Sequence, residues 1–410
     1  MTSTTSLIPI TPCTKRGMNI QRSYPSLKDL ENANENYDEE EKKVKNKSPS
    51  TRMKWKRYSR SVYLLCLLIS SFFLLYFCLV FCLNKIDMKN VKQVSLKLDD
   101  NTYKLMIVAD LDKDSKVVDN KKGKWRSLLK KAELRCDDTK SCTIHWLEDQ
   151  EIFSSFSEAG RGMELSSLVA FHNHLYACDD RTGIVYELVK GNQAIPRYIL
   201  MSGDGDTTKG QKSEWATVKD DKMIVGSFGK EYVRTDGTIE HTDYMWVSII
   251  DSNGEIYHEN WTDKYNKLRK ALHCDFPGYV IHEGINWSEE RKQWVILPRR
   301  VSQEPYDEDE DEKRGSNVVM FASDDFNSIE VKHITKVTPT RGFSEFKFLP
   351  NSGDSIIVAI KSEENEMEHT QNSFITVFSL DGRILLEETE IPGNHKYEGL
   401  EFFYFWIVCF

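Results

Sequence analysis

Residues 351–360 read NSGDSIIVAI, and residues 374–382 read FITVFSLDG. Each stretch joins a run of β-branched and aromatic residues to a tight turn, Asn-Ser-Gly in the first and Asp-Gly in the second. This pattern is typical of a short β-strand beside a turn. It recurs along the chain, and further strands are expected at Lys104–Ala109, Leu175–Ala177, Val185–Val189, Lys222–Ser227, Trp246–Ile250, Gln293–Leu297 and Val318–Ala322.

Many short strands at near-regular spacing predict a sandwich, a barrel or a propeller. The strand-rich region starts near residue 101 and covers about 300 residues, which is too long for a single sandwich. A propeller of several four-stranded blades fits this length, although the internal repeat is poor in the sequence. One helix is expected over Asn260–Leu272, opened by Thr262.

Residues 62–83 form a stretch of 22 residues without a charge. At about 1.5 Å rise per residue, a helix of this length spans the hydrocarbon core of a bilayer. The basic side chains lie mainly before it, which predicts an uncleaved type II anchor with a cytosolic N-terminus. A cleaved signal peptide usually lies near residue 1 and ends in small residues, and 22 uninterrupted apolar residues would be unusual for a buried core helix.

The anchor divides the chain. Residues 1–61 are polar and basic and are expected to be a disordered cytosolic tail, and residues 84–100 a stalk. The folded body is expected at 101–402, with an apolar extension at 403–410. The net charge of −9 and pI near 5.7 argue against a general nucleic-acid binder.

Two features of the body agree with an oxidising lumen. Cys136 and Cys142 flank a polar turn, which predicts a hairpin closed by a disulfide. Cys178, Cys274 and Cys409 leave an odd thiol in the body. Asn260-Trp-Thr and Asn286-Trp-Ser are glycosylation sequons, although such triplets also occur by chance.

Ordered blocks of the body carry a family resemblance. They include FSEAGRGMELSSL, LYACDDRTGIVYEL, GQKSEWATVKDDKMIVGSFGKE, PGYVIHEGINW, VILPRRVSQEPY, PTRGFSEFKFLPNS and KYEGLEF. From about Trp125 to Phe402 the chain resembles the calcium-activated nucleotidase (apyrase) family. This resemblance implies an all-β five-bladed propeller with a calcium ion near the central channel. The type II anchor resembles that of the vertebrate members more than the secreted salivary apyrases.

The resemblance also implies a calcium site that takes one Ser or Glu from each blade. The matching positions are Ser166, Glu214, Glu283, Ser344 and Glu398, spaced 48 to 69 residues apart. Ca²⁺ takes six to eight oxygen ligands, and three Glu carboxylates can supply some of them. Whether the two serines offer hydroxyl or backbone oxygen stays open.

Arg161, Arg181 and Arg299 match family positions near the nucleotide, and guanidinium groups bind phosphate bidentately. The alternative for each is a salt bridge between blades. Asp180 is the first choice to position or deprotonate the attacking water, and Glu231 the second. Trp215 and Tyr232 are candidates for stacking on the base or for the core.

These inferences predict a Ca²⁺-dependent hydrolase that releases phosphate from UDP and GDP, with ADP and triphosphates as further candidate substrates. A lumenal enzyme in the Golgi or endoplasmic reticulum would clear UDP left by glycosyltransferases, whereas a cell-surface enzyme would act on extracellular ADP or ATP. The alternative is a catalytically silent, calcium-stabilised propeller that acts as a binding or adhesion module. Whether the chain forms a homodimer stays open.

Overall fold

The computed structural model describes residues 101–403, apart from 118–122, 138–139, 191, 335 and 366–369. The tail, anchor and stalk expected at 1–61, 62–83 and 84–100 lie outside the described residues, as do 404–410. None of the helices among the described residues is long and apolar enough to cross a bilayer.

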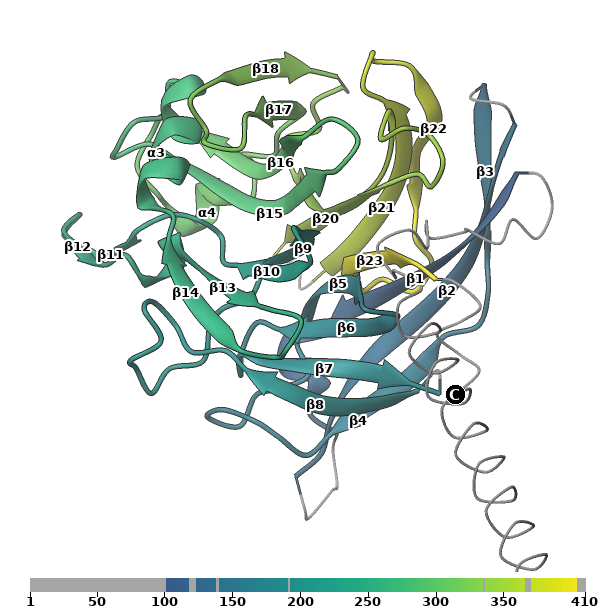
Figure 1. Cartoon of the computed structure of the whole chain (residues 1–410), viewed down its shortest axis with the longest axis horizontal. Coiled ribbons are helices and arrows are strands. Elements are labelled where there is room, and N and C mark those ends of the chain that lie inside the picture. Colours follow the sequence, from purple (N-terminus) through teal and green to yellow (C-terminus); the bar gives the residue numbers. More distant parts are fainter. Residues whose placement is uncertain are drawn as a thin grey trace, which may run out of the picture. The chain divides into compact units, whose positions relative to one another are not determined.

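Five antiparallel sheets of four main strands form the blades of a propeller (Figure 1). Blade 1 contains β5 (Leu165–Phe171), β6 (His174–Asp179), β7 (Ile184–Val189) and β8 (Gln193–Ile199). Blade 2 contains β9 (Trp215–Lys219), β10 (Lys222–Gly226), β13 (Trp246–Ile250) and β14 (Ile256–Asn260). Blade 3 contains β15 (Tyr279–Ser288), β16 (Gln293–Ser302), β17 (Val318–Ala322) and β18 (Ile329–His333). Blade 4 contains β19 (Arg341–Phe348), β20 (Ile356–Asn365), β21 (Thr370–Ser379) and β22 (Ile384–Glu390).

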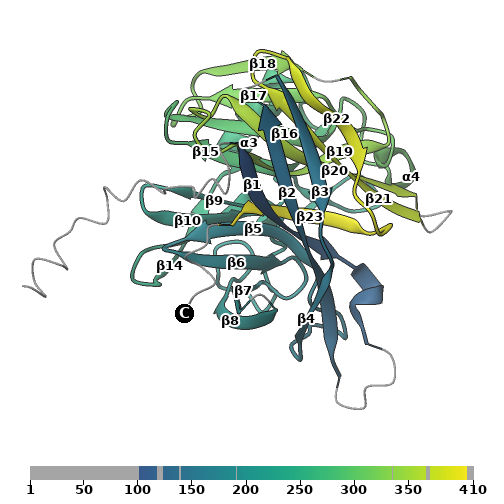
Figure 2. The same cartoon turned by 90° about the vertical axis from the view of Figure 1, so that its right-hand side faces the viewer.

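Blade 5 joins the two ends of the body. Its strand order is β23 (Lys396–Phe402), β1 (Thr102–Asp110), β2 (Trp125–Asp137) and β3 (Ser141–Trp146), and β4 (Gln150–Ser154) also pairs with β2. The last strand therefore lies against the first, with Leu105 opposite Phe402 and Ile107 opposite Leu400. Figure 2 shows β23 between β1 and β5. This pairing closes the ring and leaves no open gap between first and last blade.

Short hairpins, helices and 3₁₀ turns lie in the loops between the blade strands. The β11 (Tyr232–Val233) and β12 (Ile239–His241) hairpin and the 3₁₀ turn η3 (Asp243–Met245) lie between β10 and β13. The helix α3 (Thr262–Ala271) joins blades 2 and 3, and α4 (Glu308–Asp311) lies between β16 and β17. A second 3₁₀ turn, η2 (Asp112–Ser115), follows β1.

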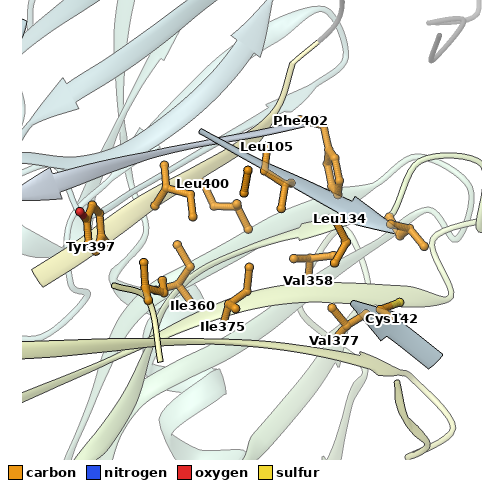
Figure 3. Close-up of a cluster of buried hydrophobic side chains, with 14 of the residues drawn as sticks. Leu105, Leu134, Cys142, Val358, Ile360, Ile375, Val377, Tyr397, Leu400 and Phe402 are labelled. Carbon is orange, nitrogen blue, oxygen red and sulfur yellow. The ribbon is translucent and has the colours of Figure 1, made fainter. Parts of the chain in front are cut away.

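Apolar side chains fill the space between neighbouring blades. Between blades 4 and 5, the buried residues include Leu105, Leu134, Val358, Ile375 and Leu400 (Figure 3). They come from alternate positions of their strands, as expected where one face of each sheet is covered. At about 1.5–3 kcal/mol for each fully buried aliphatic side chain, this packing is a main source of stability.

A second cluster joins blades 2 and 3. Trp215, Trp261 and Trp294 pack there, with ring centroids of Trp261 and Trp294 5.1 Å apart. Trp215 is fully buried, and its indole N–H donates to the carbonyl of Ser227 at 3.0 Å. Trp215 therefore belongs to the core, which was one of its two expected roles.

The expected elements are confirmed with small shifts of their ends. Each strand range predicted from the sequence overlaps an observed strand, and Val318–Ala322 coincides with β17. The helix begins at Thr262, whose N–H donates to the Asn260 side chain at 2.9 Å. Cys136 and Cys142 face each other across β2 and β3 and form the expected disulfide. Cys178 and Cys274 are buried thiols, and Cys409 lies outside the described residues.

Candidate functional site

The innermost strand of each blade lies nearest the axis of the propeller. β5, β9, β15, β19 and β23 contact one another in turn around a ring. Four of the five predicted calcium ligands lie on these strands, and Glu214 directly precedes β9. Each blade therefore contributes one predicted ligand from, or directly beside, its innermost strand.

Irregular pairing marks four of these positions. The ladders of β5, β15, β19 and β23 each shift register at the predicted ligand, Ser166, Glu283, Ser344 and Glu398 in turn. A bulge leaves one residue outside the ladder and re-aims its side chain. Glu214 lies just beyond the last pair of its ladder, and its N–H donates to the carbonyl of Gly226 at 2.8 Å.

Close packing of the inner strands explains a glycine beside one of these bulges. A Cβ on Gly399 would lie 2.7 Å from the backbone of Ser167 and 2.6 Å from the side chain of Val108. Glycine thus allows β23 to approach β5 closely at Glu398. All five predicted ligands are buried, with Glu283 the most exposed at 7%.

Arg299 on β16 brings three of the predicted ligands together. Its Nη1 lies 2.5 Å from Glu283 Oε2, 2.9 Å from Glu398 Oε1 and 3.4 Å from Ser344 Oγ. Its Nη2 donates to Glu364 Oε2 at 3.1 Å. Only 6% of the Arg299 side chain is exposed. We call Arg299, Glu283, Glu398 and Glu364 the arginine cluster.

Lys396 extends the arginine cluster toward β1. Its Nζ lies 3.2 Å from Glu398, 3.1 Å from Glu364 and 3.0 Å from Asp110. Burial alone would raise the pKa of Glu364, but the charges of Lys396 and Arg299 hold it down at about 2.

Lys212 forms a second group with two carboxylates, which we call the lysine cluster. Its Nζ lies 2.5 Å from Asp180 Oδ2 and 2.7 Å from Glu214 Oε1. Burial alone would lower the pKa of Lys212, but these two carboxylates hold it well above its usual value. The other oxygen of Asp180, Oδ1, is buried and has no hydrogen-bond partner among the described residues.

A tight turn presents Asp180 at the end of β6. Asp179 Oδ1 accepts from the backbone N–H groups of Arg181 and Thr182, at 2.9 and 3.1 Å. Gly183 has φ +71°, and a Cβ there would lie 2.2 Å from the carbonyl oxygen of Leu200. The Asp-Asp-Arg-Thr-Gly sequence therefore folds as a turn because its first Asp caps the backbone, which frees its second Asp for the site.

The two other predicted arginines lie nearer to solvent. Arg161 pairs with Glu164 and, at 3.0 Å, with Asp112, and 33% of its side chain is exposed. Arg181 Nε lies 2.8 Å from Glu158, and 30% of its side chain is exposed. Both retain accessible donors, because a guanidinium has five N–H groups.

An acidic group that the sequence reasoning missed lies beside Arg161. Oxygens of Asp110, Asp112 and Glu164 fall within 4.8 Å of one another, close enough to hold a metal ion. Burial, together with the charges of Asp110 and Asp180, raises the pKa of Glu164 to about 7. Asp110-Leu-Asp112 carries no motif of its own, and only the end of β1 brings it next to Glu164.

Glu231 is not placed with Asp180. Both of its carboxylate oxygens accept from Arg269 Nη2 of α3, at 3.0 and 2.9 Å, and the pair is buried. The adjacent Tyr232 is 46% exposed and stacks on His241, with ring centroids 5.1 Å apart. Tyr244 contacts both rings, so the three side chains form one aromatic group. Burial raises the pKa of Tyr244, and the positive charge of Lys212 opposes this rise.

The donor set around the axis fits a calcium ion. Glu214, Glu283 and Glu398 offer carboxylate oxygens, and the buried Ser166 Oγ has no hydrogen-bond partner among the described residues. Ca²⁺ accepts oxygen ligands of these kinds in flexible geometry. Lys212, Arg299 and Lys396 neutralise the same carboxylates, so a divalent cation would compete with them.

Comparison with known proteins covers nearly all of the body. The family model described as Apyrase matches residues 111–403. Soluble calcium-activated nucleotidase 1 of Rattus norvegicus is 44% identical over 302 residues, which are 73% of this chain and 73% of that protein. Apyrase apy-1 of Caenorhabditis elegans is 41% identical over 75% of this chain and 86% of its own. An apyrase of Cimex lectularius is 42% identical over 73% of this chain and 82% of its own.

Proposed function

This chain belongs to the apyrase family, and on that premise we propose that it is a calcium-dependent nucleotidase that hydrolyses nucleoside diphosphates. The observation that supports this most directly is the placement of Ser166, Glu283, Ser344 and Glu398 at bulges of four inner strands. Such bulges aim side chains at one centre, which a structural salt-bridge network alone does not require.

Calcium would be held by the five residues that the blades contribute. Glu214, Glu283 and Glu398 would supply carboxylate oxygens, and Ser166 and Ser344 the remaining protein oxygens. When bound, the ion would supply positive charge that stabilises negative charge on phosphate oxygens.

Arg161, Arg181 and Lys212 would bind the phosphates. Each has a side chain that is about one third exposed, so each can reach a substrate while still tethered to a carboxylate. Planar guanidinium groups match phosphate oxygens bidentately, and Lys adds a point charge. Arg299 is almost fully buried among carboxylates, and we assign it the role of positioning Glu283 and Glu398.

Asp180 would orient and deprotonate the attacking water. Lys212 fixes one of its oxygens at 2.5 Å, which leaves Oδ1 as the free acceptor. The water oxygen would bond to the terminal phosphorus as the bond from that phosphorus to the bridging oxygen breaks, and the water proton would pass to Asp180. The nucleoside monophosphate would leave with the bridging oxygen, and inorganic phosphate would be the other product. Glu231 has both oxygens on Arg269, so we propose that it supports α3 and the neighbouring loop.

Tyr232 is our candidate for stacking on the nucleobase. Its ring is exposed, stacks on His241 and contacts Tyr244 edge-on. Every nucleobase presents an aromatic face, so stacking on Tyr232 would accept several bases instead of selecting one. We therefore propose UDP and GDP as substrates, with ADP and triphosphates as further ones.

We also propose that the folded body lies in the lumen of the Golgi or endoplasmic reticulum, anchored through residues 62–83. Clearing UDP left by glycosyltransferases would be its task there, whereas at the cell surface its substrates would be ADP or ATP. A homodimer remains a prediction.

Phosphate release from UDP by the full chain, in calcium or in EGTA, tests the proposal. We expect release only in calcium, and release slowed by about 10²–10⁴-fold in an Asp180→Asn variant. Calcium-induced thermal stabilisation without phosphate release from UDP, GDP, ADP or ATP would favour the alternative, a calcium-stabilised binding module.

A further inference from the structure

Two sequons of almost identical sequence lie in opposite environments. Asn260-Trp-Thr262 ends the outermost strand of blade 2, whereas Asn286-Trp-Ser288 lies within the innermost strand of blade 3. We propose that Asn260 carries an N-linked glycan and that Asn286 does not. The inference rests on the proposed lumenal placement of the body and goes beyond the hydrolytic function.

The Asn260 side chain is poised for modification. The residue is exposed, and its Oδ1 accepts the N–H of Thr262 at 2.9 Å. The amide nitrogen Nδ2, which is the atom that a glycan joins, has no hydrogen bond in this arrangement among the described residues. A glycan on Nδ2 leaves Oδ1 free to keep its contact with the start of α3.

The surroundings of Asn260 also leave room for a large group. Among the strands that the structure describes, β14 pairs only with β13, and none of them covers its other edge. Glu259 and Tyr257 on the same strand are exposed. A glycan at the end of this strand would shield an open sheet edge, which is otherwise a site for unwanted pairing.

The Asn286 side chain is committed to the interior. The residue is 5% exposed, and its Nδ2 donates to the carbonyl of Phe346 at 2.7 Å. Its Oδ1 accepts from Lys347 Nζ at 3.4 Å. Ser288, the third residue of this sequon, is fully buried, and its hydroxyl donates to Asp354 at 2.7 Å. A glycan on Asn286 would break these contacts and hold blade 3 away from blade 4.

The modification itself needs only the usual lumenal donor, a lipid-diphosphate-linked oligosaccharide, and its transferase. The sugar C1 forms a bond to Nδ2, and the bond from C1 to the diphosphate oxygen breaks. The amide loses one proton, and the lipid diphosphate leaves. Because Asn260 lies on the outermost strand, three strands of the blade separate it from the axis, so activity should not depend on the glycan.

Expression of the full chain in eukaryotic cells, followed by amide-cleaving glycosidase in H₂¹⁸O, tests both sites in one sample. A formerly glycosylated Asn becomes ¹⁸O-labelled Asp in the peptide mass spectrum. We expect the label at Asn260 and an unmodified Asn286. Asn260→Gln and Thr262→Ala should each abolish the glycosidase-dependent gel shift, while Thr262→Ser should retain it and UDP hydrolysis should be unchanged in Asn260→Gln.

A reporter site in the same hairpin separates this inference from the topology. Glu255→Thr creates Asn253-Gly-Thr in the exposed turn between β13 and β14. Glycan at Asn253 without glycan at Asn260 would overturn the site, and so would occupancy of Asn286. No glycan at either Asn253 or Asn260 would overturn the proposal through its lumenal premise. Phosphate release in the same preparations would show that the proposed hydrolysis survives that result.

Discussion

The arginine cluster and the lysine cluster both neutralise carboxylates with a cation, but the two cations differ in type and in exposure to solvent. Each places a cation among carboxylates near the propeller axis, Arg299 among Glu283, Glu398 and Glu364, and Lys212 between Asp180 and Glu214. The Arg299 side chain is 6% exposed, whereas that of Lys212 is 37% exposed.

This difference in exposure indicates that the arginine cluster has a structural role and that the lysine cluster exchanges partners. A rigid, planar guanidinium holds several carboxylates in one geometry, so the arginine cluster suits a fixed frame. An ammonium on a flexible stem is a compact point charge that can move between partners, so the lysine cluster suits exchange with substrate or metal. Replacing charged residues in each cluster, and comparing the effects on stability, turnover and calcium binding, tests this difference in roles.

The largest effect is expected for Arg299→Met. It leaves two buried carboxylates, Glu283 and Glu398, and the partly exposed Glu364 without their shared partner. Loss of one member of a buried ion pair costs about 3–5 kcal/mol. Denaturant unfolding in EGTA should show this loss, and calcium should recover part of it because it restores positive charge. UDP hydrolysis should fall below detection.

Arg126→Ala provides the matched control, because Arg126 forms an ion pair with Glu151 in which both side chains are more than 40% exposed. Its effect on the free energy of unfolding should stay within about 0.5 kcal/mol. An equally small effect for Arg299→Met would remove the idea of a rigid arginine frame.

The next effect concerns chemistry in the lysine cluster. Asp180→Asn should lower turnover of UDP by about 10²–10⁴-fold, the usual scale for a positioned acid–base group, while calcium-induced thermal stabilisation persists. Asp221→Asn changes an exposed Asp and should leave turnover unchanged. Turnover of Asp180→Asn within threefold of the parent would make Asp180 a structural residue.

The free energy of unfolding should depend on pH through Glu364 of the arginine cluster. The pKa of Glu364 is about 2 in the folded chain and near 4.5 when unfolded, so its carboxylate stabilises the fold above pH 4.5. This stabilisation is lost as pH falls from 4.5 toward 2. Glu364→Gln should therefore lower the free energy of unfolding by about 2 kcal/mol at pH 7 and by less than half of that at pH 3.

Unfolding of parent and variant in urea at pH 7, 5 and 3 measures the difference. Glu363→Gln is a neighbouring control, because Glu363 pairs with Arg341 outside the arginine cluster at 3.4 Å. A pH-independent deficit in Glu364→Gln would show that its ion pairs with Arg299 and Lys396 contribute little.

The smallest effect on stability is expected for Lys212→Met. Lys212 is 37% exposed and partly solvated, so its loss should cost less than the loss of the buried Arg299, although Asp180 and Glu214 are left without their shared cation. Removing its charge beside Glu214 should raise calcium affinity by about three- to tenfold at low salt, and the gain should shrink as salt screens the site. Calorimetric titration with calcium would measure this, and weaker calcium binding would contradict the proposed competition.

The fold was largely predictable because its signals are local. Strands such as Val318–Ala322, the turn between Cys136 and Cys142, and the helix at Thr262 each follow from neighbouring residues. The number of blades did not follow from periodicity, because the repeat is weak, and it came from the family resemblance. The closing pair of β23 and β1 joins segments almost 300 residues apart, which no local pattern reports.

The identity of single site residues could be predicted from the sequence, but their arrangement in space could not. The five ligand positions could be carried over from a family, but the placement of four of them at bulges is a property of the ladders. Lys396 meets Asp110 where β23 pairs with β1 in blade 5, and Glu164 approaches Asp110 from the segment before β5 of blade 1. Glu231 was predicted as the second catalytic candidate, and sequence spacing did not show that Arg269 holds it.

The closing strand also sets an order of events during synthesis. β1 is made early, but its partner β23 emerges about 300 residues later, which takes roughly 15–60 s at about 5–20 residues per second. Until then one edge of β1 is unpaired, a condition that invites association with other chains and calls for chaperone protection. Because Glu398 lies on β23, the nascent chain also lacks a ligand of the proposed calcium site for this whole period. Ring closure therefore delays any calcium-dependent activity until translation of the body is complete.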